Sequence, residues 1–153
     1  MRSPQRQLNF DVFSHSYSVN PGQLSQFNAP LFGSYVPAGY PSPAMDYNEE
    51  SLDLNELCVQ HPTATYYVRA SGNSMIEAGI HDQDVLVVDR SLRASDGNIV
   101  VAALNGEFTV KVLTTKPSLA LEPRNEAFDT ISISEDDEFD IFGVVTFVVH
   151  STL

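Results

Sequence analysis

The chain lacks the features that several large protein classes require. It has no tryptophan and only one cysteine among 153 residues. Because a disulfide needs two cysteines, none can form within the chain, and nothing indicates an oxidising compartment. No apolar run approaches the ~20 residues of a membrane-spanning helix, and residues 1–20 lack the apolar core of a signal peptide. We therefore expect a cytoplasmic protein that neither enters a membrane nor is secreted.

Basic side chains are also scarce. The chain has 8 Lys and Arg against 20 Asp and Glu, which gives a net charge of −12. Before Ala38 the charged residues are only Arg2, Arg6 and Asp11. The acidic excess therefore belongs to the rest of the chain. Proteins that bind DNA directly present clustered Lys and Arg, and this chain has no such cluster. We do not expect strong direct DNA binding, and any link to DNA should pass through protein partners.

Spacings typical of cofactor sites are missing as well. The four histidines are far apart in the sequence, and neither His-x-x-x-His nor Cys-x-x-Cys occurs. No glycine-rich phosphate loop is present. Cys58 lies between Leu57 and Val59, which favours a packing role over a catalytic one. The sequence thus implies no metal and no cofactor.

Residues 1–43 differ in composition from the rest of the chain. They are rich in Ser, Asn, Gln, Pro and Gly, with isolated aromatic residues and no helical or alternating period. This composition predicts a flexible N-terminal arm. The remaining residues, 44–153, are enough for one domain with a single core.

The pattern beyond residue 43 is mostly that of β-strands. Short β-branched and aromatic runs separated by turn residues predict strands at residues 65–69, 85–88, 99–104, 107–113, 119–122, 130–133 and 141–149. Asn105-Gly106 predicts a type I′ hairpin between the third and fourth of these, because both residues accept a positive φ. One short helix is expected through Leu54, Leu57 and Cys58. We therefore predict a mostly β domain with twisted, partly closed sheets.

Ser74 and Lys111 are the residues most indicative of chemistry. Ser74 lies in a predicted turn, and a serine hydroxyl becomes a good nucleophile only when a base removes its proton. Lys111 is the only charged residue between Glu107 and Lys116, and apolar surroundings favour the neutral amine that can act as a base. Alternation along the strand places Thr109 and Lys111 on one face. The simpler alternative is an outward-facing lysine and an ordinary turn serine.

A Ser-His-Asp triad is a second alternative for the chemistry. His61, His81 and His150 are available as bases, and His81 is followed by Asp82 close to Ser74 in the sequence. However, residues 79–84 read as a polar turn before a strand, which predicts a solvated His81. The triad is therefore the weaker hypothesis.

Several motifs in one order resemble the UmuD family of self-cleaving SOS mutagenesis proteins and, more distantly, the peptidase domain of LexA-type repressors. They are YPSPA at 40–44, LDLNEL at 52–57, SGNSM at 71–75, DVLVVD at 84–89, GEFTVK at 106–111 and FGVV at 142–145. The resemblance implies the LexA/UmuD peptidase fold, with Ser74 as nucleophile and Lys111 as its base. It also places the cleaved bond between Ala38 and Gly39.

The residues around that bond are compatible with this role. Pro37 biases Val36 toward extended backbone, and the small Ala38 and Gly39 fit a narrow cleft, although an ordinary linker would have the same composition. The resemblance further implies a homodimer, cleavage stimulated by a RecA filament on single-stranded DNA, and a product that joins a UmuC-like catalytic subunit. That subunit would be a Y-family, error-prone translesion DNA polymerase.

Three rival functions follow from parts of the same pattern. A LexA-like transcriptional regulator would need an N-terminal helix-turn-helix, but the residues before Ala38 show no helical period. A bacterial signal peptidase also uses a serine before methionine with a lysine base, but the membrane anchor is missing. A non-catalytic interaction module is the third, and it differs from the peptidase in that the purified chain would never shorten itself.

Overall fold

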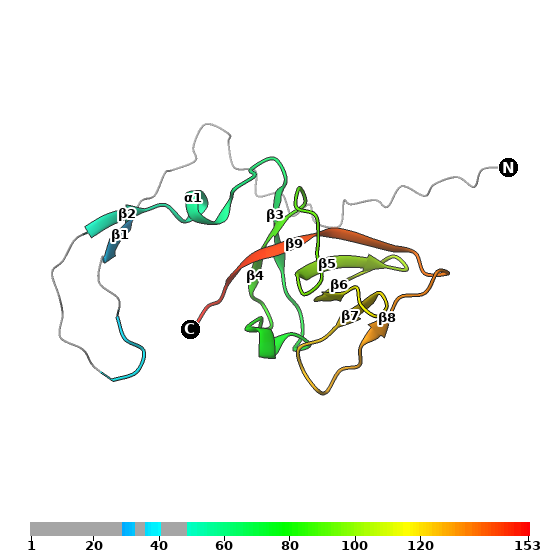
Figure 1. Cartoon of the computed structure of the whole chain (residues 1–153). Helices are drawn as coiled ribbons and strands as arrows, with labels where there is room; N and C mark the ends of the chain where they lie inside the picture. The colour runs from blue at the N-terminus through cyan, green and yellow to red at the C-terminus, as the bar shows by residue number, and fades with distance from the viewer. Residues whose placement is uncertain (1–28, 33–35, 41–48) are drawn as a thin grey trace. The chain divides into compact units, whose positions relative to one another are not determined.

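The computed structural model describes residues 29–32, 36–40 and 49–153, and the chain divides into two compact units, Met1–Leu54 and Asn55–Leu153 (Figure 1). In the first unit, β1 (Ala29–Phe32) pairs with β2 (Glu49–Leu52) in antiparallel fashion. A strand therefore lies in a segment for which the sequence predicted no regular structure. Most of the predicted arm falls outside the described residues, so its flexibility and its boundary at residue 43 stay predictions.

The second unit is built on a seven-stranded antiparallel sheet in the order β3-β4-β9-β5-β6-β7-β8. Its strands are β3 (Thr65–Arg69), β4 (Val85–Asp89), β5 (Ile99–Leu104), β6 (Glu107–Thr114), β7 (Ala120–Glu122), β8 (Ile131–Ser132) and β9 (Phe139–Val149). Helical structure in the described residues is limited to α1 (Leu54–Cys58) and a 3-10 turn, η2 (Ile76–Ala78). The predicted mostly β fold with one short helix is confirmed.

The hairpin predicted from Asn105-Gly106 is also confirmed. Asn105 and Gly106 have φ values of 51° and 86°, and the turn brings Leu104 opposite Glu107. A positive φ at both turn residues matches the twist of the flanking strands. β5 and β6 are thereby held in a fixed register.

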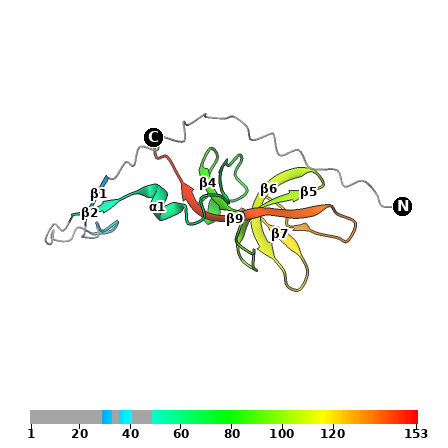
Figure 2. The same ribbon diagram turned by 90° about the horizontal axis from the view of Figure 1, so that it is seen from above.

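β9 joins the two halves of the sheet. Its first half pairs with β5 and its second half pairs with β4, so it runs between them (Figure 2). Gly143 lies at this crossing, where an added Cβ would be only 2.7 Å from Val88 Cγ1 and 3.0 Å from the Asp89 carbonyl oxygen. A glycine is needed here because a side chain would force β4 and β9 apart.

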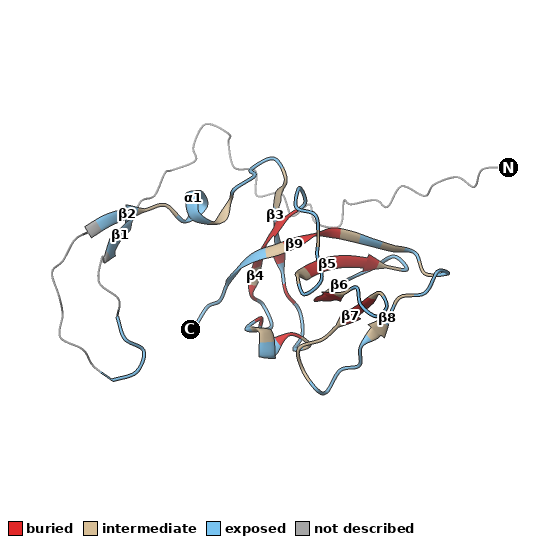
Figure 3. Cartoon of the chain, viewed as in Figure 1, coloured by how far each residue is buried: buried red, intermediate tan, exposed pale blue. Residues whose placement is uncertain are grey.

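Strands β4 and β5 are buried over most of their length, on both faces (Figure 3). On β5, Val101 packs into one hydrophobic cluster, whereas Val100 and Ala102 pack into another. Residues that alternate along a strand point to opposite faces, so the sheet carries apolar layers on both sides. Lys111 of β6 is paired with Val100, which places the lysine on one of these buried faces.

Candidate active site

Ser74 lies in the turn between β3 and η2. Gly72 turns the chain with a φ of 87°, and its N–H donates to Asp82 Oδ1 at 2.7 Å. The next residue, Met75, is 3% exposed and packs in the hydrophobic cluster of Val101. The turn is thus anchored on both sides of Ser74, whose own side chain is only partly buried.

A second anchor of this turn comes from the segment after β7, which sequence reasoning missed. The Arg124 N–H donates to the Ser74 carbonyl oxygen at 2.8 Å, and the Asn125 amide donates to the Asn73 carbonyl oxygen at 2.9 Å. β7 itself pairs with β6, where Val112 lies opposite Glu122. These contacts hold the serine turn beside the strand that carries Lys111. No local signal predicts them, because they join segments about fifty residues apart.

The structure brings Ser74 and Lys111 together. Lys111 Nζ lies 3.0 Å from Ser74 Oγ, 2.9 Å from Thr109 Oγ1 and 3.1 Å from the Val110 carbonyl oxygen. The contact with Thr109 shows that both residues share a face of β6, as the alternation predicted. The alternative of an outward-facing lysine is therefore wrong, since Lys111 is only 7% exposed.

The surroundings of Lys111 favour its neutral form. Burial lowers the pKa of the Lys111 amine. Within the described part of the chain, no carboxylate forms an ion pair with it. A neutral amine has two N–H donors and one lone pair. The three contacts match these two donors and one acceptor when the amine donates to the Val110 carbonyl oxygen and to Thr109 Oγ1. Its lone pair then accepts a hydrogen bond from the Ser74 hydroxyl.

The three described histidines are engaged with aspartates rather than with Ser74. His61 Nδ1 lies 2.6 Å from Asp89 Oδ2, and His150 Nδ1 lies 2.6 Å from Asp84 Oδ1. His81 is half exposed, and its backbone N–H donates to Asp84 Oδ2 at 2.7 Å. The arrangement gives no support to a Ser-His-Asp triad at Ser74.

These contacts also reveal a cluster that the sequence did not predict. His81, Asp84 and His150 meet at the start of β4, although 66 residues separate Asp84 from His150. Burial raises the pKa of Asp84, but the hydrogen bonds from the His81 N–H and from His150 outweigh it, and the pKa is lowered. The carboxylate therefore stays ionised between two imidazoles.

Ala38 and Gly39 lie in the first unit, within the short described stretch 36–40. Both residues are exposed, and an added Cβ at Gly39 would meet nothing within 4 Å. Tyr40, which follows them, is 95% exposed. The proposed cleavage bond is therefore accessible in its own unit.

Several known proteins are similar in sequence to this chain. Residues 30–146 match the family model described as Peptidase S24-like. The chain is 51% identical to protein SamA of Salmonella typhimurium, over 83% of this chain and 89% of that protein. It is 46% identical to protein MucA of Escherichia coli, over 91% of this chain and 92% of that protein. LexA repressor 2 of Pseudomonas syringae is 49% identical over 52% of this chain and 40% of its own length.

Among the described residues, no helix has the length and apolarity needed to cross a bilayer.

Proposed function

We propose that this chain, which belongs to the Peptidase S24-like family, is a self-cleaving serine peptidase with a Ser74–Lys111 dyad. The family agrees with the resemblance to UmuD proteins found in the sequence. The observation that carries the proposal is the 3.0 Å contact between Lys111 Nζ and Ser74 Oγ, made by a buried lysine that has no carboxylate partner among the described residues. This environment gives the pair the properties that a base and a nucleophile need.

The reaction begins with proton transfer. Neutral Lys111 accepts the proton of Ser74 Oγ, and the oxygen attacks the carbonyl carbon of Ala38. The resulting oxyanion would be stabilised by backbone N–H groups of the serine turn. The Lys111 ammonium then returns its proton to the leaving amine of Gly39, and the peptide bond breaks. Water hydrolyses the Ala38 ester on Ser74, with Lys111 again serving as the base.

The substrate is a segment of the same polypeptide. A tethered or dimer-partner segment has a high effective concentration, so a modestly activated serine can still cut it. The small residues at the bond and the exposure of residues 36–40 support this assignment. The product would span residues 39–153.

The biological setting follows from the family resemblance. We place the protein in the SOS response of the cytoplasm, where a RecA filament on single-stranded DNA stimulates its cleavage. The shortened chain, as a homodimer, then serves a UmuC-like Y-family polymerase in error-prone translesion synthesis. The acidic composition is consistent with action through protein partners rather than through direct contact with DNA.

Intact-mass and N-terminal analysis of the full chain tests the function. After incubation with RecA, single-stranded DNA and an ATP analogue, the parent should yield a fragment beginning at Gly39, and Ser74→Ala should stay intact. Gly39→Asp should also stay intact, because it adds bulk and a carboxylate beside the developing oxyanion. Ser42→Ala, three residues away, is the matched control and should cleave normally.

The outcomes separate the assignments. A parent chain that never shortens would favour a non-catalytic interaction module. A fragment with a different first residue would overturn the Ala38-Gly39 bond while leaving the dyad standing.

A further inference from the structure

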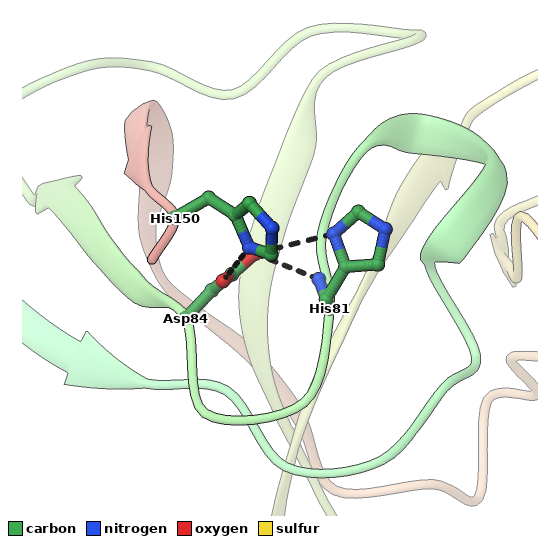
Figure 4. A group of neighbouring side chains, drawn as sticks. All are labelled: His81, Asp84 and His150. Atoms are coloured by element: carbon green, nitrogen blue, oxygen red, sulfur yellow. Dashed lines mark hydrogen bonds and ion pairs between the residues drawn. The ribbon is translucent and has the colours of Figure 1, made fainter. Parts of the chain in front are cut away.

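A compact group of side chains of the types that bind metals lies where β4 begins and β9 ends. Figure 4 shows His81 and His150 beside the carboxylate of Asp84. One ligand atom from each residue lies within 4.8 Å of the others. His81 and Asp84 come from the turn that precedes β4, and His150 directly follows β9. The group therefore joins two segments that are distant in the sequence.

The carboxylate at the centre of this group is held in place. Asp84 is 3% exposed, and its Oδ2 accepts the His81 backbone N–H at 2.7 Å. The Asp84 carbonyl oxygen also accepts the Ala70 N–H at 2.8 Å. A ligand with fixed orientation loses little entropy when it binds an ion.

The two imidazoles are accessible from solvent. The side chains of His81 and His150 are 49% and 44% exposed, and their ring centroids lie 4.6 Å apart. An ion can thus reach the group, and coordination positions facing solvent remain for water. Two imidazoles and one carboxylate are ligands that suit zinc-like divalent ions better than magnesium or calcium.

The distances require only a small adjustment. Tetrahedral ligands at the usual zinc bond lengths lie about 3.3 Å from one another. His81 Nδ1 is 3.6 Å from Asp84 Oδ2, close to that value, whereas His150 Nδ1 is 2.6 Å from Asp84 Oδ1. His150 would have to retreat by roughly 0.7 Å. It can do so because it lies beyond the end of β9, and its Nδ1 would bind the ion with the ring proton on Nε2.

His61 and Asp89 provide a natural contrast. Their Nδ1 to Oδ2 distance is also 2.6 Å, and Asp89 is likewise buried. Here the other carboxylate oxygen accepts the N–H and the hydroxyl of Ser91, and no second histidine of the described residues joins the pair. The two His–Asp pairs thus have the same distance, but only the pair of His150 and Asp84 has a third side chain beside it that could bind an ion.

We propose that His81, Asp84 and His150 form a binding site for a zinc-like divalent transition-metal ion. The bound ion would tie the residue after β9 to the turn that leads from Ser74 to β4. This inference does not depend on self-cleavage, and its test has no catalytic readout.

Calorimetric titration of the full chain with Zn²⁺ at pH 7.5 tests the site. The parent should bind one equivalent through it, and His81→Ala and His150→Ala should each weaken that binding at least tenfold. His61→Ala is the matched control and should bind like the parent. His15→Ala, which removes the histidine outside the described residues, should also leave this equivalent in place.

Two further measurements make the outcome definite. Co²⁺ bound to the parent should give visible absorption bands that both site variants lose, and excess Mg²⁺ should not compete. Zn²⁺ should raise the melting temperature of the parent more than that of His150→Gln. The proposal is overturned if the parent binds no Zn²⁺ at millimolar concentration, or if both site variants bind it with the parent's affinity and stoichiometry.

Discussion

Lys111 and Asp89 are two buried ionisable residues in one sheet, and burial disfavours the charged form of each. Their surroundings offset this effect for Asp89 but not for Lys111. Asp89 is 4% exposed and accepts hydrogen bonds from Ser91 and His61, which lower its pKa to about 2 against the effect of burial. Lys111 is 7% exposed and contacts only neutral oxygens, so burial lowers its pKa without opposition. The aspartate is kept charged, as a structural anchor requires, whereas the lysine is pushed toward the neutral form that a base requires.

The largest expected effect is the loss of cleavage when the unpaired lysine is replaced. Lys111→Ala removes the base, and Lys111→Arg supplies a guanidinium that stays protonated. Both should slow self-cleavage by about 10²–10⁴-fold, the usual contribution of a general base. The rate is measured from the accumulation of the 39–153 fragment, with circular dichroism to show that the fold is retained. Cleavage of a folded Lys111→Ala chain at the parent rate would remove the lysine from the mechanism.

The next effect is the pH dependence of cleavage. Only neutral Lys111 can accept the serine proton, so the rate without any filament should rise roughly tenfold per pH unit until the lysine pKa is reached. Burial lowers that pKa, so the rise should level off below the usual range for lysine. A plateau that begins near the ordinary histidine pKa of about 6.5 would instead favour a histidine base.

The paired aspartate should contribute to stability rather than to chemistry. Asp89→Asn removes the charge that Ser91 and His61 stabilise, and should lower the free energy of unfolding by about 1–3 kcal/mol. Because the folded pKa of Asp89 is depressed, its contribution is complete above the ordinary carboxyl pKa and is lost as pH falls toward about 2. Urea unfolding at pH 7 and pH 3 measures this.

The control for that measurement is Asp129→Asn, at an exposed carboxylate. It should leave stability unchanged at both pH values. An Asp89→Asn chain as stable as this control at pH 7 would show that Asp89 is not a structural anchor and does not differ from Lys111 in the way proposed.

The smallest expected effect is on stability, when the Lys111 amine is removed. Lys111→Met keeps the apolar stem and removes the desolvated amine, so stability at pH 7 should stay within about 1 kcal/mol of the parent or rise. Urea unfolding of this variant, beside Asp89→Asn, compares the two residues directly. A loss of more than about 2 kcal/mol would mean that the lysine is as much a structural anchor as the aspartate.

Local sequence signals account for most of the second unit. Every strand predicted there is present with small differences at its ends, because β-branched runs between turn residues are strong local signals. β1 was missed because Pro30 interrupts a four-residue segment, and proline is compatible with a short edge strand but does not predict one. The face of β6 that carries Lys111 followed from alternation, but its burial required the neighbouring strands.

Local sequence signals could not predict how segments far apart in the chain are arranged. The position of β9 between β4 and β5 depends on pairing between segments far apart in the chain, which no local pattern specifies. The anchoring of Ser74 by Arg124, and the meeting of His81 with His150, follow from that arrangement. Resemblance predicted Ser74 and Lys111 as the dyad that we propose, whereas their 3.0 Å approach depends on the assembled sheet.

The place of β9 also orders events during protein synthesis. The β3–β4 hairpin, whose connection carries Ser74, and the β5–β6 hairpin, which carries Lys111, lie on opposite sides of β9 in the sheet. The ribosome makes both hairpins before it makes β9, and translation adds about 5–20 residues per second. The nascent chain therefore carries its serine and its lysine for some seconds before the strand between the two hairpins exists. An unfinished polypeptide should be unable to cut itself, because its last strand completes the peptidase.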